Sequence, residues 1–137
     1  MQKHLIQAAE RGDAEAQFNL AIMYENGLLD SRYVAEGSRA EAVRWLLAAA
    51  EQGLARAQVK LAEIYAAEPD RPHRSLEACK WYLLAIRELS GGHRQKAQSA
   101  YDKLASGLSP AQTAEVGRLV RDWKPKSAAI AVAEVAA

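Results

Sequence analysis

The stretch WLLAAAEQGLARAQVKLAEIY at residues 45–65 decides the fold, because the chain contains a near-copy of it. Residues 4–24 read HLIQAAERGDAEAQFNLAIMY, and the two strings agree at 11 of 21 positions when they are aligned at an offset of 41. Five of these matches are alanine, which is a common residue in this chain. The other six matches are Leu5 with Leu46, Glu10 with Glu51, Gly12 with Gly53, Gln17 with Gln58, Leu20 with Leu61 and Tyr24 with Tyr65. A duplicated stretch of this length predicts repeated structural units that stack on one another.

Composition and turn residues predict an all-α chain. Good helix formers dominate the sequence, and no run alternates between apolar and polar residues as a half-buried strand does. Gly12 and Gly53 each follow a helical stretch, where a left-handed closing residue is favoured. The sequence SPAQ at residues 109–112 is a capping box with proline at the first helical position. We expect helices at residues 3–11, 14–26, 38–52, 55–67, 74–89, 93–106 and 110–123, and a tail after Lys126 that is either helical or frayed.

The spacing of aromatic residues predicts a solenoid of helical hairpins. Trp45 and Trp81 lie 36 residues apart, and each follows an alanine by three residues. The distance from tyrosine to tryptophan is 21 residues in the first unit, from Tyr24, and 16 in the second, from Tyr65. The first unit therefore carries an insertion of five residues. A single hairpin of such helices cannot bury both of its apolar faces, so it stacks on a copy of itself.

This pattern resembles the SEL-one-like repeat, a relative of the tetratricopeptide repeat. The motif of that family places Ala, Leu, Tyr and Gly on the first helix of a unit and its turn, and Ala, Trp, Ala and Gly on the second. The positions that match this repeat signature are Gly12, Ala16, Leu20, Tyr24, Gly27, Ala42, Trp45, Ala49, Gly53, Ala57, Leu61, Tyr65, Ala78 and Trp81. The match covers roughly residues 4–90. The resemblance implies a right-handed α/α solenoid of stacked antiparallel helix hairpins, with about seven helices.

The expected organisation is a single helical-repeat domain at residues 1–126, followed by a C-terminal tail at residues 127–137. The parts of the domain are a half-unit at 1–12, full units at 13–53 and 54–92, and a capping hairpin at 93–124. The repeat pattern degrades after Leu89, and an apolar stripe on the last expected helix is typical of the cap that keeps a solenoid soluble.

Charge and hydropathy exclude several classes of partner. The 137 residues include 18 basic and 17 acidic ones, and a net charge of +1 gives no reason to expect nucleic acid or an anionic membrane surface. The basic residues at the end of the last expected helix suit a helix C-terminus; they are Arg118, Arg121, Lys124 and Lys126. No apolar run reaches the length of a membrane span, so no membrane insertion is expected. With one cysteine and no secretory signal, a cytoplasmic location is expected; a periplasmic one stays open, because a removed signal peptide leaves no trace.

The sequence contains no motif of a catalytic, cofactor-binding or metal-binding site. The three histidines are far apart, and His73 has a potential metal-ligating neighbour at helical spacing, Glu77. Two ligands without a third make a poor metal site, and an exposed ion pair is the simpler interpretation. Cys79 has no basic partner in sequence and is interpreted as a part-buried, inert thiol. We therefore expect no catalysis, no cofactor and no metal, and an enzyme with a grafted hydrolytic site is kept as an alternative.

Surface positions on the first helix of each unit differ between the near-copies, whereas the core positions agree. In stacked hairpins this helix lines the concave side. The predicted partner-binding residues are Glu15, Asn19, Ile22, Asn26, Arg56, Lys60 and Glu63. A merely solvated face is the alternative, and the insertion around Tyr33 is a second candidate contact.

The resemblance implies a non-catalytic adaptor or scaffold that binds a peptide or a partner protein on its concave face. One alternative is a subunit that self-assembles or stacks end to end, for instance as a homodimer. A chain that starts with a half-unit leaves an apolar helix face at that end, which a second copy can cover. A mass that depends on concentration distinguishes the assembly subunit from a monomeric adaptor.

Overall fold

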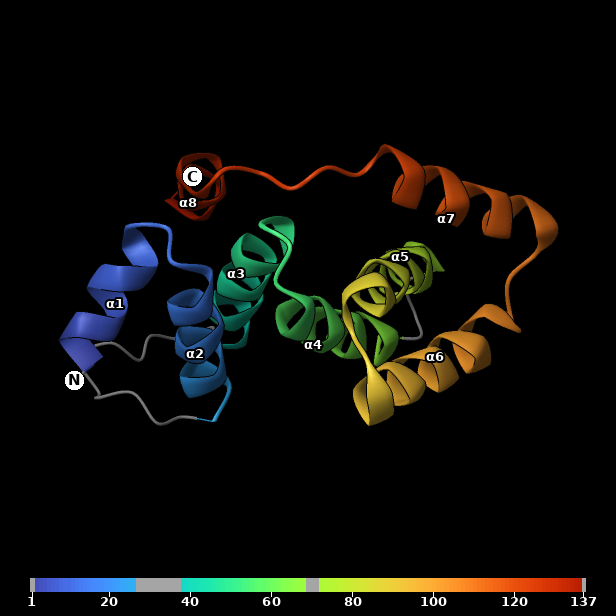
Figure 1. The fold of residues 1–137 in the computed structure, drawn as a ribbon, viewed down its shortest axis with the longest axis horizontal. Coiled ribbons are helices and arrows are strands. Elements are labelled where there is room, and N and C mark those ends of the chain that lie inside the picture. Colours follow the sequence, from blue (N-terminus) through green and yellow to red (C-terminus); the bar gives the residue numbers. More distant parts are fainter. Residues whose placement is uncertain (1, 27–37, 69–71, 137) are drawn as a thin grey trace. The chain divides into compact units, whose positions relative to one another are not determined.

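A computed structural model describes residues 2–26, 38–68 and 72–136 (Figure 1). Over these ranges the chain forms eight helices and no strand, which confirms the all-α prediction. The helices are α1 Gln2–Glu10, α2 Ala14–Glu25, α3 Ser38–Glu51, α4 Ala55–Ala66, α5 Pro72–Glu88, α6 Gly91–Ala105, α7 Pro110–Asp122 and α8 Ala128–Ala136. The first seven begin and end within two residues of the helices expected from the sequence, and α8 shows that the tail is helical. Gly27 and Tyr33 lie outside the described residues.

Helix starts follow from local hydrogen bonding. At the start of α2, the Asp13 side chain accepts a hydrogen bond from the backbone N–H of Ala16 at 3.1 Å. At the start of α7, Ser109 and Gln112 form the reciprocal capping box, in which each side chain accepts from the other residue's backbone N–H, at 3.2 and 2.8 Å. Each cap satisfies backbone N–H groups that have no partner within the helix, so the helix begins there.

The first helices of the two near-copies, α1 and α3, end in the same turn. The glycine N–H bonds to the carbonyl three residues earlier, at 3.0 Å in both turns. The next N–H bonds to the carbonyl five residues earlier, at 3.1 Å after α1 and 3.2 Å after α3. This is the Schellman arrangement, which needs a residue with positive φ. Gly12 and Gly53 have φ of +102° and +101°, values that strain any residue with a Cβ.

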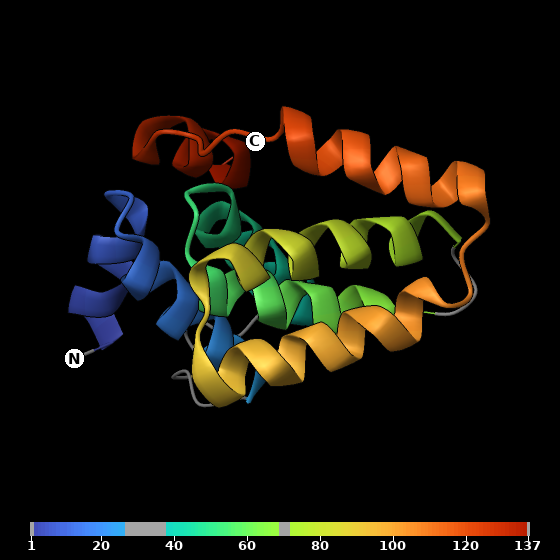
Figure 2. The same cartoon turned by 45° about the vertical axis from the view of Figure 1, so that its right-hand side comes forward.

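The chain packs as two compact units, of which the first comprises residues 1–57 and 125–137. In this unit α2 contacts both α1 and α3, and α8 contacts α3 (Figure 2). Its buried hydrophobic residues are Ala9, Ala16, Leu20, Ala21, Ala42, Trp45, Leu46, Ala48, Ala49, Ala50, Ala57 and Ala131. Most are alanines, so the helix backbones approach closely and a few large side chains such as Trp45 fill the remaining space.

A buried amide links three segments of the first unit. Gln17 of α2 is 0% exposed. Its Nε2 donates to the carbonyl of Ala9 in α1 at 3.1 Å, and its Oε1 accepts from Nε2 of Gln52, just after α3, at 2.9 Å. A buried amide that loses its partners costs about 1–3 kcal/mol, so these bonds favour one register of α2 against its neighbours.

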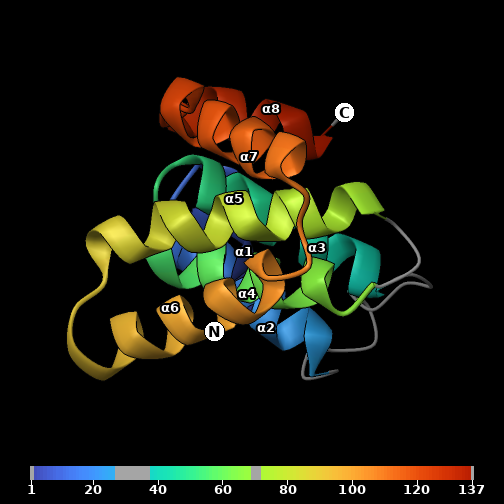
Figure 3. The ribbon, with the colours of Figure 1, turned by 90° about the vertical axis from the view of Figure 1, so that its right-hand side faces the viewer.

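The second unit comprises residues 58–124. Within it α5 lies between α6 and α7 and contacts both (Figure 3). Its buried hydrophobic residues are Leu61, Ala62, Ile64, Tyr65, Ala78, Cys79, Trp81, Tyr82, Leu84, Ala85, Ile86, Ala97 and Val116. The rings of Trp81 and Trp123 meet edge to face, with centroids 6.2 Å apart and planes at 78°. This contact, together with a hydrogen bond of 3.3 Å from Arg87 to the Val120 carbonyl, holds α7 against α5.

Candidate protein-binding surface

The predicted binding residues of α2 form one strip on the first unit. Glu15, Asn19 and Asn26 are exposed and Ile22 is half-buried. Their spacing of four, three and four residues places them on one face of the helix. The half-buried Phe18 lies on the same face, one turn after Glu15. We call these five residues the α2 strip.

Arg56, near the start of α4, lies beside the α2 strip. Its guanidinium forms an ion pair with the Glu15 carboxylate, and its Cζ lies 5.1 Å from the centroid of the Phe18 ring. The side chains of Arg56 and Glu15 are 53% and 57% exposed. An exposed ion pair contributes about 0–1 kcal/mol to stability. The pair therefore shapes this surface more than it stabilises the fold.

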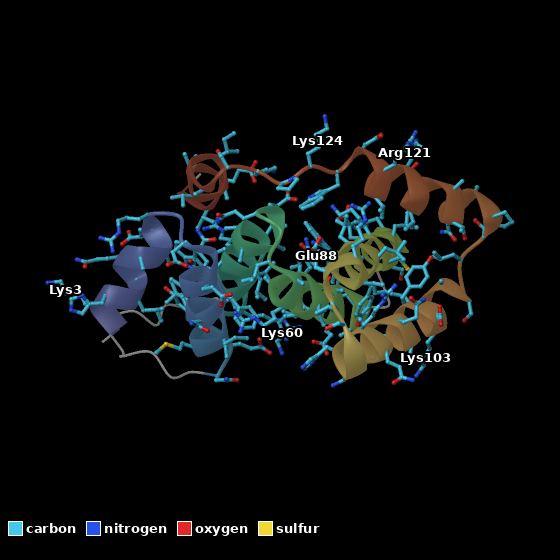
Figure 4. The ribbon with its side chains drawn as sticks, viewed as in Figure 1. Lys3, Lys60, Glu88, Lys103, Arg121 and Lys124 are labelled. Atoms are coloured by element: carbon cyan, nitrogen blue, oxygen red, sulfur yellow. The ribbon has the colours of Figure 1, made fainter. Side chains whose placement is uncertain are left out.

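Lys60 and Glu63 belong to the second unit. Lys60 is half-buried and extends from α4 (Figure 4), and Glu63 is exposed. Burial, and then the charge of Glu63, raise the pKa of Tyr82 in the same unit. That Lys60 and Glu63 form one binding face with the α2 strip remains a prediction.

Most residues of the repeat signature lie in the interior. The buried ones are Gly12, Ala16, Leu20, Ala42, Trp45, Ala49, Ala57, Leu61, Tyr65, Ala78 and Trp81. Gly53 and Tyr24 are half-buried. Burial, followed by the carboxylates of Glu41 and Glu10, raises the pKa of Tyr24. Trp45 and Trp81 thus lie in the cores of the two units. Their rings are not exposed as a platform on which a nucleic-acid base can stack.

Groups with chemical reactivity are dispersed over the described part of the chain. No three His, Cys, Asp or Glu residues in it are placed to hold a metal ion. His4, His73 and His93 are each exposed. Cys79 is 0% exposed, and burial raises the pKa of its thiol to about 11. The thiol is therefore protonated at neutral pH, whereas the thiolate is the nucleophilic form.

We expect Cys79 to react with an aromatic disulfide reagent about 100-fold more slowly in the native protein than in denaturant at the same pH. Its burial blocks access, and its raised pKa lowers the thiolate fraction. Because the folded thiol keeps its proton while the unfolded thiol loses it above about pH 9, the free energy of unfolding also falls as the pH rises from about 9 to about 11. The rate is measured from the absorbance of the coloured aromatic thiolate that the reagent releases. Equal native and denatured rates would contradict this prediction.

Basic side chains at the end of α7 have acidic neighbours. Arg118 is paired with Glu115 of the same helix, and Arg121 Nε lies 3.5 Å from an oxygen of Asp122. Arg121 and Lys103 of α6 are exposed and are labelled in Figure 4. Exposed pairs of this kind are typical of a solvated helix surface.

Two features of this candidate surface are not found when only identical residues of the two near-copies are compared. Phe18 has no identical partner in the near-copy, where Val59 takes its place, but a search for apolar pairs finds it. Glu15 and Arg56 are 41 residues apart, which makes them equivalent positions of the two near-copies. Opposite charges at equivalent positions are the signal that predicts this contact, because such positions meet when repeats stack.

No helix within residues 2–26, 38–68 and 72–136 is long and apolar enough to cross a membrane. Comparison with protein-family models, with curated proteins and with solved structures gives no match for this chain.

Proposed function

We propose that this chain is a non-catalytic adaptor that binds a peptide or a helix of a partner protein along the α2 strip, on the concave face of a helical-repeat solenoid. The ion pair between Glu15 and Arg56 supports the solenoid, because it joins equivalent positions of the two near-copies. The resemblance to the SEL-one-like repeat also supports a solenoid. Repeat solenoids use such faces as extended binding surfaces.

The observation that carries this proposal is the composition of the α2 strip. Phe18 and Ile22 are half-buried, and exposed polar side chains flank them. An apolar centre with a polar rim is typical of protein–protein interfaces. The amides of Asn19 and Asn26 each donate and accept hydrogen bonds, which suits the backbone of a peptide. A partner with an apolar side chain to rest on Phe18 fits this surface.

The alternative of end-to-end stacking through α1 is the second candidate. Leu5 and Ile6 of α1 are half-buried, as Phe18 and Ile22 of the α2 strip are, and exposed polar residues flank them. The guanidinium of Arg56 over the Phe18 ring is the additional feature of the α2 strip. We therefore favour the adaptor, and a mass that depends on concentration would favour the assembly subunit.

A photo-crosslinking amino acid at position 19 tests this proposal in source cells. We expect an adduct with a partner protein, and we expect Arg56→Glu in the same chain to reduce its yield about 10-fold, because like charges at Glu15 and position 56 repel and the cation over Phe18 is lost. Urea unfolding checks that the variant is as stable as the wild type to within about 0.5 kcal/mol.

The matched control carries the same crosslinker at the exposed Lys103 of α6. Equal yields of the same adduct from positions 19 and 103 would contradict a site on the α2 strip. Adducts between two copies of this chain, and with nothing else, would favour the assembly subunit.

A further inference from the structure

Tyr65, near the end of α4 in the second unit, has a cation over its ring. The Cζ of Arg74 in α5 lies 4.5 Å from the centroid of this ring. Arg74 Nε lies 3.5 Å from a carboxylate oxygen of Glu68. A cation in this position is attracted by the negative face of the aromatic ring. The second unit therefore covers its tyrosine with a guanidinium group of its own.

Helix α3 of the first unit is the equivalent of α5. The tryptophans of the two helices lie 36 residues apart, and the residues before them align at the same offset. Each helix pairs a carboxylate with a basic side chain one turn later, Glu41 with Arg44 at 3.4 Å and Glu77 with Lys80 at 3.2 Å. Because equivalent residues form the same ion pair, the starts of the two helices can be compared position by position.

The first unit has the same tyrosine, Tyr24, but no cation at the equivalent position of α3. That position is occupied by Ser38, which carries no charge, where α5 has Arg74. Burial raises the pKa of Tyr24, and among the described residues the carboxylates of Glu41 and Glu10 raise it further. Tyr24 is half-buried, whereas its equivalent beneath Arg74 is 7% exposed. The tyrosine of the first unit thus has acidic neighbours and a more accessible ring.

We propose that Tyr24, Glu10 and Glu41 form a binding site for an arginine side chain of a partner protein. The bound guanidinium takes the place that Arg74 fills in the second unit, with its plane over the tyrosine ring and its N–H groups donating to a carboxylate. The ion pair between Glu41 and Arg44 leaves room for this second cation, because an ionised carboxylate accepts several hydrogen bonds.

This arginine site is separate from the α2 strip. Tyr24 follows Ile22 of the strip by two residues, which is about 200° around a helix. The two surfaces therefore lie on different sides of α2. The arginine site does not depend on the proposed function, and a partner that binds at one surface leaves the other accessible.

The test titrates the full-length chain, with isotope-labelled tyrosine rings, with N-acetylarginine amide. We expect NMR to show a shift of the Tyr24 ring signal, identified by its loss in Tyr24→Phe, with a Kd of about 1–10 mM, because one side chain makes few contacts. N-acetylcitrulline amide has nearly the same shape without the charge and should bind at least 10-fold more weakly. A Tyr24 signal that does not move, or that moves equally with both probes, would overturn the proposal.

Ser38→Arg supplies the missing guanidinium within the chain. We expect this variant to lose the response of the Tyr24 signal to the probe, because the new side chain occupies the site as Arg74 does in the second unit. The matched control is Ala40→Arg, which adds the same charge at an exposed position of α3 and should bind the probe as the wild type does. Undiminished binding to Ser38→Arg, or equal losses in the two variants, would overturn the proposal.

Arg74→Ser makes the reverse change in the second unit. Removal of the guanidinium should uncover Tyr65, so that its ring signal now responds to the probe in addition to that of Tyr24. A Tyr65 signal that stays silent would overturn the comparison on which the proposal rests. Free arginine, if it bound at least 10-fold more tightly than N-acetylarginine amide, would identify a site for the amino acid itself and would overturn the assignment to a partner's side chain.

Discussion

Trp81→Ala is expected to lower the free energy of unfolding of the second unit by about 3–5 kcal/mol, the usual cost of truncating a fully buried tryptophan. Trp81 is 0% exposed, and its ring packs edge to face on that of Trp123, at 6.2 Å between centroids. The ammonium of Lys80 lies 4.2 Å from the centroid of the same ring. The substitution removes these contacts and leaves a cavity that helices joined at both ends fill only in part. Urea unfolding followed by circular dichroism measures the loss.

Two further variants show whether the loss arises from the buried ring. Trp81→Phe keeps an aromatic ring in the cavity, so it should lower the free energy of unfolding less than Trp81→Ala does. Trp123→Ala should also lower the free energy of unfolding less than Trp81→Ala does, because Trp123 is only half-buried. A loss below about 1 kcal/mol for Trp81→Ala would contradict the burial of this side chain.

Gly12→Ala is expected to lower the free energy of unfolding of the first unit by about 2–4 kcal/mol, for two separate reasons. The first is the φ of +102°, which strains any residue with a Cβ. The second is the 2.5 Å approach of the added Cβ to Ala128, which forces α8 or the turn to move. Chemical denaturation measures the total, and hydrogen exchange over residues 128–136 should rise as α8 loosens.

Gly53→Ala is the matched control for the backbone cost. Gly53 has a φ of +101° and closes a turn with the same hydrogen-bond pattern. Its substitution should lower the free energy of unfolding by about 1–3 kcal/mol and raise exchange in α8 less than Gly12→Ala does. If Gly12→Ala accelerated exchange in α8 no more than Gly53→Ala does, the close contact between Gly12 and Ala128 would be disproved.

Helix positions were predictable from the sequence because their causes are local. Asp13 and Ser109 cap helices with bonds that span three residues, and Gly12 and Gly53 end helices through bonds that span three to five. Apolar positions at intervals of three and four residues mark the buried faces in the same way. These local patterns do not depend on how the helices are arranged in the tertiary structure.

The candidate binding surface was predictable only in part. The α2 strip follows from helical spacing within one segment, so its exposed face can be assigned from sequence. The place of Arg56 over Phe18 depends on how α2 and the start of α4 meet. The repeat boundaries at 13–53 and 54–92, and the partner itself, remain predictions.

The sequence by itself determined that this chain is all-α and where α1 to α7 begin and end, because helix periodicity, caps and closing glycines act within one or two turns. Tertiary structure alone decided that the tail folds as α8 against α3 and Gly12. It also decided that Trp81 packs on Trp123 and that the guanidinium of Arg56 lies over the ring of Phe18. These contacts join segments far apart in the chain, and their free energy depends on side-chain complementarity that no local pattern specifies.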